Sequence, residues 1–184
     1  MTRSLTFVFL AAALGCSSGS HYLHARADLG AIRKVAVLPF ETVTSERIAA
    51  DKVHRIFLNE LLATDAFEVV EPGVVVKVLR DERIENVAAL TPADIVKIAK
   101  GMGAQGLFFG TVVDYGDPRG GETIAPEITI QLRLVEGQTG ATVWSASRTR
   151  NGATMTARLF GLGGNSSTEV ARALIRDELS TLLR

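Results

Sequence analysis

Residues 105–115 read QGLFFGTVVDY and form the longest strand candidate in the chain. The apolar residues in the middle of this stretch follow one another without alternation, which is typical of a strand buried on both faces. We therefore predict that this strand lies in the middle of a sheet.

Two alternating segments follow the central strand. In ITIQLRLVE, residues 128–136, apolar and polar residues alternate strictly, which predicts a strand with one face toward solvent. After the turn sequence GQTG, residues 141–150 (ATVWSASRTR) alternate as well. The two segments therefore indicate a hairpin, whose strands pair antiparallel.

The segments before the central strand read as strands and helices in turn. KVAVLPF at 34–40 is a continuous apolar run ended by Pro39, which predicts another covered strand. Residues 45–64 space their apolar side chains by three and four, as an amphipathic helix does. The other elements of this part are a short strand at 67–72, a helix at 73–83, and a helix that begins at TPAD (91–94) and stops at GMG (101–103).

A helix after Ser166 ends the chain. Ser166 and Glu169 form a Ser-x-x-Glu capping box, and the apolar stripe that follows must cover one face of the sheet. The element order is strand, helix, strand, two helices, three strands, helix. Because the early strand-helix-strand units require parallel pairing and the hairpin requires antiparallel pairing, we predict an α/β fold with one mixed sheet of about five strands and helices packed on it.

The stretch AALGCSS, residues 12–18, contains the only cysteine of the chain. The apolar run Leu5–Leu14 behind Arg3 is too short to span a bilayer and is typical of a secretory signal. The stretch resembles the lipobox of bacterial lipoproteins, with Ala13 and Leu14 in reversed order, and the resemblance implies that Cys16 carries a lipid. The alternatives are an ordinary small residue near a signal-peptidase site and a free thiol.

The N-terminal prediction divides the chain into three parts. Residues 1–15 are a signal peptide, residues 16–30 a flexible tether from the lipidated cysteine, and residues 31–184 a single domain. Lipid anchoring gives the protein a membrane partner. Ser17 follows Cys16, where lipoproteins held in the inner membrane often resemble a Cys-Asp start, so we expect the outer membrane, with the domain facing the periplasm.

Composition and histidine spacing argue against nucleic acid and metal. The 20 basic and 20 acidic residues cancel, so the usual positive charge of a nucleic-acid-binding domain is missing. His21 and His24 form an H-x-x-H pair without a third ligand, which is a poor metal site. His54 lies one turn after Asp51, as a boundary histidine or a pH-sensing pair. We predict no metal and no cofactor.

Acidic and glycine-rich stretches leave an enzymatic alternative open. Asp81, Glu82, Asp114 and Asp117 are candidates for paired hydrolytic carboxylates, with solvated charge as the favoured interpretation. FGLGGNSS at 160–167 is either a flexible connection before a capped helix or an anion site. These observations keep a periplasmic hydrolase as the weakest alternative, and we expect no enzymatic activity.

Two aromatic residues have open roles. Trp144 is either a core ring on the hairpin or an exposed binding anchor, and the core is favoured because aromatic rings pack well on half-buried sheets. Tyr115 closes the central strand beside a polar loop, where a partner-facing role is conceivable.

Four stretches in succession resemble a known family. KVAVLPFE, LLATDAFEVVEP, GAQGLFFGTVVDYG and LVEGQTGATVWSAS, within about residues 33–150, are similar to the core of the CsgG-like and LpoB-like periplasmic lipoproteins. The resemblance implies an anticodon-binding-domain-like α/β core. It also implies one of two roles, since LpoB-like members stimulate a peptidoglycan synthase and CsgG-like members assemble oligomeric outer-membrane pores.

The function expected from this resemblance is non-enzymatic. We expect an outer-membrane-anchored periplasmic lipoprotein that binds a cell-envelope protein as an activator or assembly factor. The alternative within the family is a homo-oligomer, as a subunit of a secretion or envelope-assembly ring.

Overall fold

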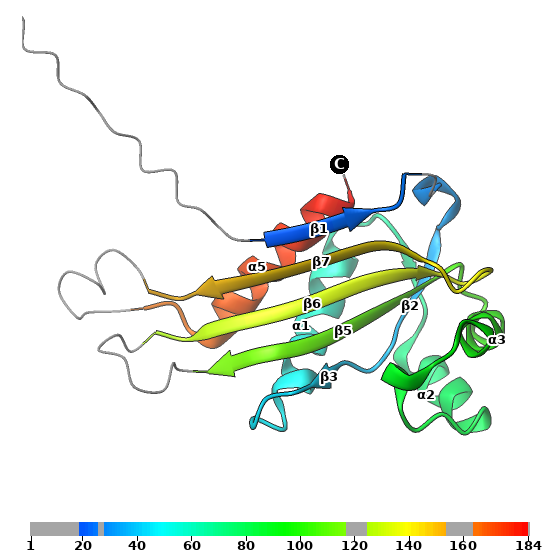
Figure 1. Ribbon diagram of the computed structural model, residues 1–184, viewed down its shortest axis with the longest axis horizontal. Helices are drawn as coiled ribbons and strands as arrows, with labels where there is room; N and C mark the ends of the chain where they lie inside the picture. The colour runs from blue at the N-terminus through cyan, green and yellow to red at the C-terminus, as the bar shows by residue number, and fades with distance from the viewer. Residues whose placement is uncertain (1–18, 26–27, 117–124, 154–163, 184) are drawn as a thin grey trace, which may run out of the picture.

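A mixed sheet of seven strands forms the centre of the molecule (Figure 1). The computed structural model describes residues 19–25, 28–116, 125–153 and 164–183. The spatial order is β1-β7-β6-β5-β2-β4, and β3 also pairs with β5. The strands are β1 (Gly19–Leu23), β2 (Lys34–Val37), β3 (Glu41–Thr42), β4 (Glu68–Val69), β5 (Gly106–Gly116), β6 (Glu127–Glu136) and β7 (Thr142–Asn151).

Strand direction divides the sheet into two halves. Strand β2 is parallel to β4 and β5, and β3 is parallel to β5, whereas β5, β6, β7 and β1 are antiparallel in succession. The predicted mixed sheet is thereby confirmed, and so is the middle position of β5. The predicted hairpin at 128–136 and 141–150 is β6 and β7.

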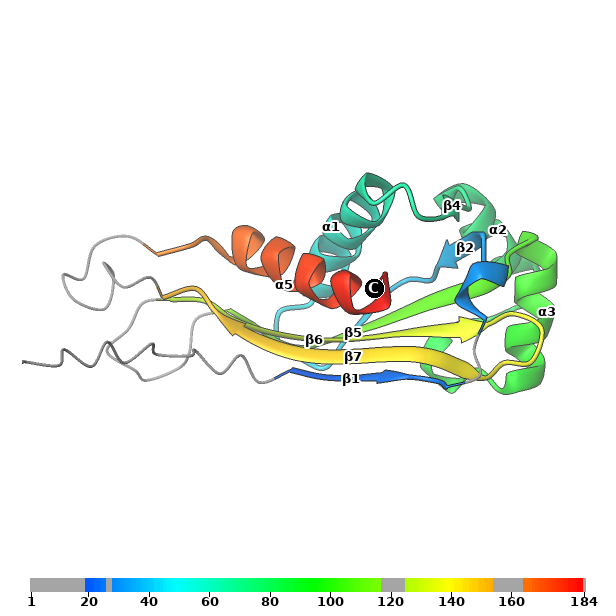
Figure 2. The ribbon, with the colours of Figure 1, turned by 90° about the horizontal axis from the view of Figure 1, so that it is seen from above.

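In the described part of the chain, four helices pack on the sheet. They are α1 (Ala49–Ala63), α2 (Pro72–Asp81), α3 (Pro92–Met102) and α5 (Ser167–Leu182), and two short 3₁₀ helices, η1 (Leu29–Ala31) and η2 (Val87–Ala89), lie between them in the sequence. Helices α1 and α5 lie side by side over one face (Figure 2). Helices α2 and α3 pack at one end of the sheet, against the other face. We call these the covered face and the second face.

Alternate residues of the central strand, β5, belong to two separate hydrophobic cores. Phe108 and Val112 point into the core beneath α1 and α5, and Leu107 and Phe109 point into the core beneath α2 and α3. A row of aromatic rings crosses the first core. The ring centroids of Phe57 and Phe108 are 5.2 Å apart, and those of Phe108 and Trp144 are 6.3 Å apart. Such edge contacts stabilise the packing of α1 and β7 on β5.

Both predicted helix caps are present. The Thr91 side chain accepts a hydrogen bond from the backbone N–H of Asp94, and Ser166 does the same with Glu169, each in a complete capping box. Helix α3 ends at Gly103, whose φ of 62° is the left-handed conformation that glycine adopts readily.

The strand predicted at 34–40 is interrupted. Strand β2 ends at Val37, and the chain rejoins β5 as β3 after Pro39, which has no N–H to donate to a neighbouring strand. The Phe40 ring then lies over Gly110, where a Cβ would stand 2.5 Å from the ring carbons. Glycine at this position lets the ring approach the backbone of β5.

The expected count of about five strands is too low, because no pattern of apolar and polar residues in the sequence marks two short strands. One of them, β1, lies within residues 16–30, where we predicted a flexible tether. All five of its residues are exposed, and they are held by antiparallel pairing with β7. The other is β3. The strand predicted at 67–72 is also shorter than expected, because only Glu68 and Val69 pair with β2.

A buried carboxylate ties α1 to α5. Glu60 of α1 is 8% exposed and receives two arginines of α5. Its Oε1 lies 3.2 Å from Nε of Arg172, and its Oε2 lies 2.5 Å from Nε of Arg176.

In the part of the chain that the structure describes, no helix is long and apolar enough to cross a membrane.

Helix α5 should contribute much of the stability of the covered face. We expect Leu174→Ala, at a side chain that is 0% exposed, to lower the free energy of unfolding by about 2–5 kcal/mol. Ser180→Ala on the exposed side of the same helix should change it by no more than about 0.5 kcal/mol. Urea unfolding followed by circular dichroism measures both. Equal effects of the two substitutions would contradict the packing described here.

Candidate functional site

The second face of the sheet is covered at one end only. Helices α2 and α3 pack over β2 and the start of β5, and among the described residues no helix lies over the remaining surface of β5, β6, β7 and β1 (Figure 2). A cavity of about 370 Å³ lies on this surface, with η2 and Glu41 at its rim. We call it the groove.

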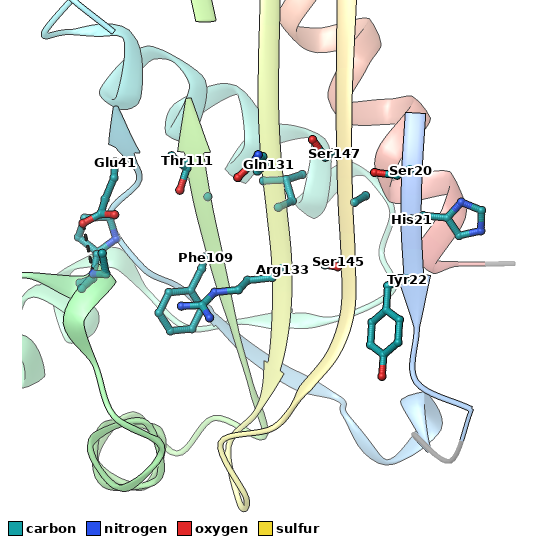
Figure 3. Close-up of a pocket in the computed structure, with 16 residues that line it drawn as sticks. Ser20, His21, Tyr22, Glu41, Phe109, Thr111, Gln131, Arg133, Ser145 and Ser147 are labelled. Carbon is teal, nitrogen blue, oxygen red and sulfur yellow. Dashed lines mark hydrogen bonds between the residues drawn. The ribbon is translucent and has the colours of Figure 1, made fainter. Parts of the chain in front are cut away.

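Strand register lines up side chains across the groove in two rows (Figure 3). The first runs across five strands through successive register pairs, and we call it the polar row. It consists of Glu41, Thr111, Gln131, Ser147 and Ser20. The second lies two residues further along the strands, and we call it the arginine row. It consists of Phe109, Arg133, Ser145 and Tyr22.

Arg133 is the cation of the groove. Its guanidinium carbon lies 4.1 Å from the centroid of the Phe109 ring, which is itself 7% exposed. Among the described residues the guanidinium makes no ion pair and no hydrogen bond. Burial lowers the pKa of Arg133 below its usual value, but an arginine side chain keeps its charge in proteins. The groove thus holds a charged fork of donors backed by an aromatic ring.

The rim of the groove on the side of β3 is fixed by Glu41. The Glu41 Oε1 atom accepts a hydrogen bond from the backbone N–H of Ala88 in η2 at 3.2 Å. The side chain of Asn86 caps the same 3₁₀ helix by accepting from this N–H at 2.9 Å. Glu41 therefore connects the polar row to the loop between α2 and α3.

The two side chains of the H-x-x-H pair, His21 and His24, lie on β1 and just after it. His21 points away from the groove in Figure 3, whereas the His24 ring makes an edge contact with Tyr22, which faces the groove. Within the described ranges, no three histidine, cysteine or acidic side chains come together to hold a metal ion. His54 is half-buried against Phe40, and burial lowers its pKa while the backbone of Val37 and the charge of Asp51 oppose that shift.

The three acidic candidates that the structure describes, Asp81, Glu82 and Asp114, are not gathered in one place. Asp81 pairs with Lys77 at 2.6 Å, and Glu82 forms an ion pair with Lys97. Asp114 is exposed near the far end of β5, at the other end of the molecule from α2 (Figure 1). Asp117 lies outside the described residues, as do Cys16 and residues 160–163 of the glycine-rich segment before α5.

The two aromatic candidates are on the covered face. Trp144 is 0% exposed, and its Nε1 donates a hydrogen bond to Oγ1 of Thr181 at 3.1 Å, so the core interpretation is confirmed. Tyr115 is partly buried at the margin of the same core, with the ammonium of Lys52 5.5 Å from its ring centroid. Burial raises the pKa of Tyr115.

Glu178 is a buried acid beneath the β7 side of the sheet. It lies on α5, is 1% exposed, and neither of its carboxyl oxygens has a hydrogen-bond partner among the described residues. Burial raises the pKa of Glu178 to about 8, against the opposing effect of the Arg148 charge. An uncharged carboxyl group at neutral pH is the consequence.

A family model described as the peptidoglycan-synthase activator LpoB matches residues 23–149. The chain belongs to the LpoB family. The LpoB-like part of the predicted resemblance is therefore confirmed, whereas the CsgG-like part and the anticodon-binding-domain likeness stay predictions. The match begins at the last residue of β1 and ends in β7, so it includes Arg133 and most of the groove but neither Ser20 nor Tyr22.

Solved structures share the fold of this LpoB-family chain. The PelC dodecamer from Paraburkholderia phytofirmans is similar with a TM-score of 0.60 and 23% identity, over 90% of this chain and 97% of that one. The lipoprotein GNA1162 from Neisseria meningitidis has a TM-score of 0.59 and 17% identity, over 82% of this chain and 98% of that one. No curated protein sequence matches the chain.

Sequence reasoning missed the groove but contained one signal for it. The strict alternation in 128–136 placed Thr129, Gln131 and Arg133 together on a solvent-facing side, and the structure confirms that these residues point away from the core beneath α1 and α5. The register between strands decides which residues of other strands lie beside Arg133. The sequence of a single strand does not determine that register.

The buried acid predicts an unusual dependence of stability on pH. Between about pH 5 and pH 8 the folded protein retains the Glu178 proton that the unfolded chain releases, so the free energy of unfolding should fall as pH rises, by at most about 1.4 kcal/mol per pH unit. Glu178→Gln should remove this contribution, and Glu85→Gln at an exposed position should not. Urea unfolding at several pH values tests this. A wild-type slope that Glu178→Gln leaves unchanged would contradict it.

Proposed function

We propose that this chain is a non-enzymatic activator of a peptidoglycan synthase, anchored by a lipid on Cys16 in the outer membrane and facing the periplasm. The observation that carries the proposal is the family match over residues 23–149, which spans the elements from β2 to β7. An activator of this kind needs a surface for its partner rather than a reactive centre. The groove on the second face is a surface of that kind.

A hydrolase is not favoured by any feature of the described residues. Two of the acidic candidates, Asp81 and Glu82, pair with lysines on the surface of α2 and α3. Paired catalytic carboxylates need a common cleft and a defined separation. The groove instead combines one arginine and the single carboxylate of Glu41 with neutral hydroxyl and amide groups.

The membrane anchor in this proposal rests on the sequence around Cys16. The short apolar run before it and the lipobox-like stretch support export and acylation. Acyl chains bind a membrane by about 0.8 kcal/mol per buried CH₂ group, and stable anchoring takes two or more chains. The domain would then work within reach of the outer membrane.

A homo-oligomeric ring is the second candidate. The PelC structure with the same fold is a dodecamer, as its description states. The sheet of this chain ends in exposed β1 on one side, and an open edge is a surface on which another strand can pair. This candidate concerns assembly and is compatible with binding of an envelope protein.

Loss of the lipid should release the protein from the membrane. We expect Cys16→Ser to move from the outer-membrane fraction to the soluble periplasmic fraction, because acyl chains are the membrane attachment in this proposal. Fractionation with immunoblotting measures the distribution, and Ser17→Ala serves as the matched control. A Cys16→Ser protein that stays in the outer-membrane fraction would contradict lipid anchoring.

Activation should be visible with purified components. We expect the full chain to increase the rate at which a peptidoglycan synthase of the same organism polymerises its lipid-linked substrate, and to release no fragments from peptidoglycan by itself. Sedimentation of the same preparation gives the number of copies in the active species. Unchanged synthase rates with every peptidoglycan synthase of the organism would refute the activator role, and a large assembly without stimulation would favour the ring.

A further inference from the structure

The groove presents a positive charge that the described part of the protein does not neutralise. The guanidinium of Arg133 is half-buried and stacks on Phe109, yet no carboxylate of the described chain pairs with it. Glu41 is the carboxylate that influences it, from the other row of the groove and without an ion pair. A guanidinium carries five N–H donors, so Arg133 has donors to offer to a ligand.

The chemistry of this arginine favours a carboxylate as its ligand. The planar fork of a guanidinium matches the two oxygens of a carboxylate, and such charge-assisted pairs are among the stronger hydrogen bonds. One side of the guanidinium lies against the Phe109 ring, with the guanidinium carbon 4.1 Å from the ring centroid. This stacking restricts the side chain, so less conformational entropy is lost when a ligand binds.

The polar row suits an extended main chain. Adjacent strands are about 4.8 Å apart, so the four steps from Glu41 to Ser20 span roughly 19 Å, the length of about five or six extended residues. Between these ends the row presents Thr111, Gln131 and Ser147, whose hydroxyl and amide groups both donate and accept hydrogen bonds. Peptide groups need donors and acceptors in turn.

The arginine row disfavours a sugar chain as the occupant. The face of the Phe109 ring is covered by the guanidinium, so it is not open for stacking against a flat ligand. Ser145 follows Arg133 in the row, and the next ring, Tyr22, lies at the edge strand. The groove therefore offers hydrogen bonds along its length, the cation of Arg133 and, at one end, the carboxylate of Glu41.

We propose that the groove docks an extended, acidic peptide segment of a protein partner, with a carboxylate of the segment on Arg133 and its main chain along the polar row. The proposal depends on the proposed function only for identifying that partner as a peptidoglycan synthase. Peptide binding is measured without any synthase, so the two can fail separately.

The test uses two capped peptides and the full chain in detergent micelles. The peptide Ser-Ala-Glu-Ala-Ser and its counterpart with glutamine in place of glutamate differ in one charged group. We expect the glutamate peptide to bind roughly tenfold or more tightly, because it alone supplies the partner for the guanidinium. Backbone NMR shifts on titration should change at Thr111, Gln131 and Ser147.

Three variants separate the role of Arg133 from general charge. Arg133→Gln should bind both peptides equally weakly. Ser145→Glu keeps the arginine but places a carboxylate directly across from it in the register, and it should also abolish the preference. Arg55→Gln removes an exposed arginine of α1, on the covered face, and should leave the preference unchanged. Thermal unfolding confirms that each variant is folded.

Several outcomes would overturn the proposal. These are equal binding of the two peptides by the wild-type chain, a preference that survives both groove variants, and shift changes that map to α1 and α5 instead of the groove. Preferential binding of chitotetraose, a neutral sugar chain, would show that the occupant is a glycan.

If the glutamate peptide binds as expected but Arg133→Gln still stimulates the synthase fully, the groove is not the docking site for that partner, and the activator function stands. If the peptide binds and the wild-type chain stimulates no synthase, the activator function fails and the peptide specificity of the groove stands.

Discussion

Strand β5 must be buried on both faces along its first half and on one face along its second half. Residues 106–110 are all buried, and beyond them Val112 is the last buried residue of the strand, between the more exposed Thr111 and Val113. The cause is the length of the helical cover, because α2 and α3 reach only the end of the second face where β2 pairs with β5. The rest of the structure follows from this limit, since strands beyond that cover must be polar on one side, and that polar side is the groove.

The elements with a strong local pattern could be predicted from the sequence. The apolar run in 105–115 indicated the central strand, the alternation in 128–136 indicated a strand with one face toward solvent, and the Thr91 and Ser166 caps marked two helix starts. In these cases the residues that decide the structure are within a few positions of one another. Short strands fail this condition. Strand β1 is exposed throughout, so no hydrophobic pattern marks it, and its partner β7 is more than a hundred positions away in the sequence.

In the candidate site too, some features can be predicted from the sequence of one strand, and others depend on how the strands pair. The alternation of residues along β6 is sufficient to place Arg133 on the polar side of its strand. Its contact with Phe109, by contrast, depends on the register between β5 and β6, and the row from Glu41 to Ser20 depends on four such registers. Asp81 and Glu82, which are conspicuous in the sequence, lie outside the groove, where each forms an ion pair with a lysine.

The position of β1 also decides how the molecule responds to mechanical force. Gly19 pairs with Arg148 and Leu23 with Trp144, so the N-terminal end of β1 lies along the outer side of β7. A pull on that end directed along the strand loads the hydrogen bonds of the ladder together, in shear, whereas a pull directed away from the sheet opens them one after another. The same strand carries Ser20 and Tyr22 of the groove. Tension on the N-terminal end that peels β1 from β7 would therefore remove one wall of the groove while leaving both hydrophobic cores intact.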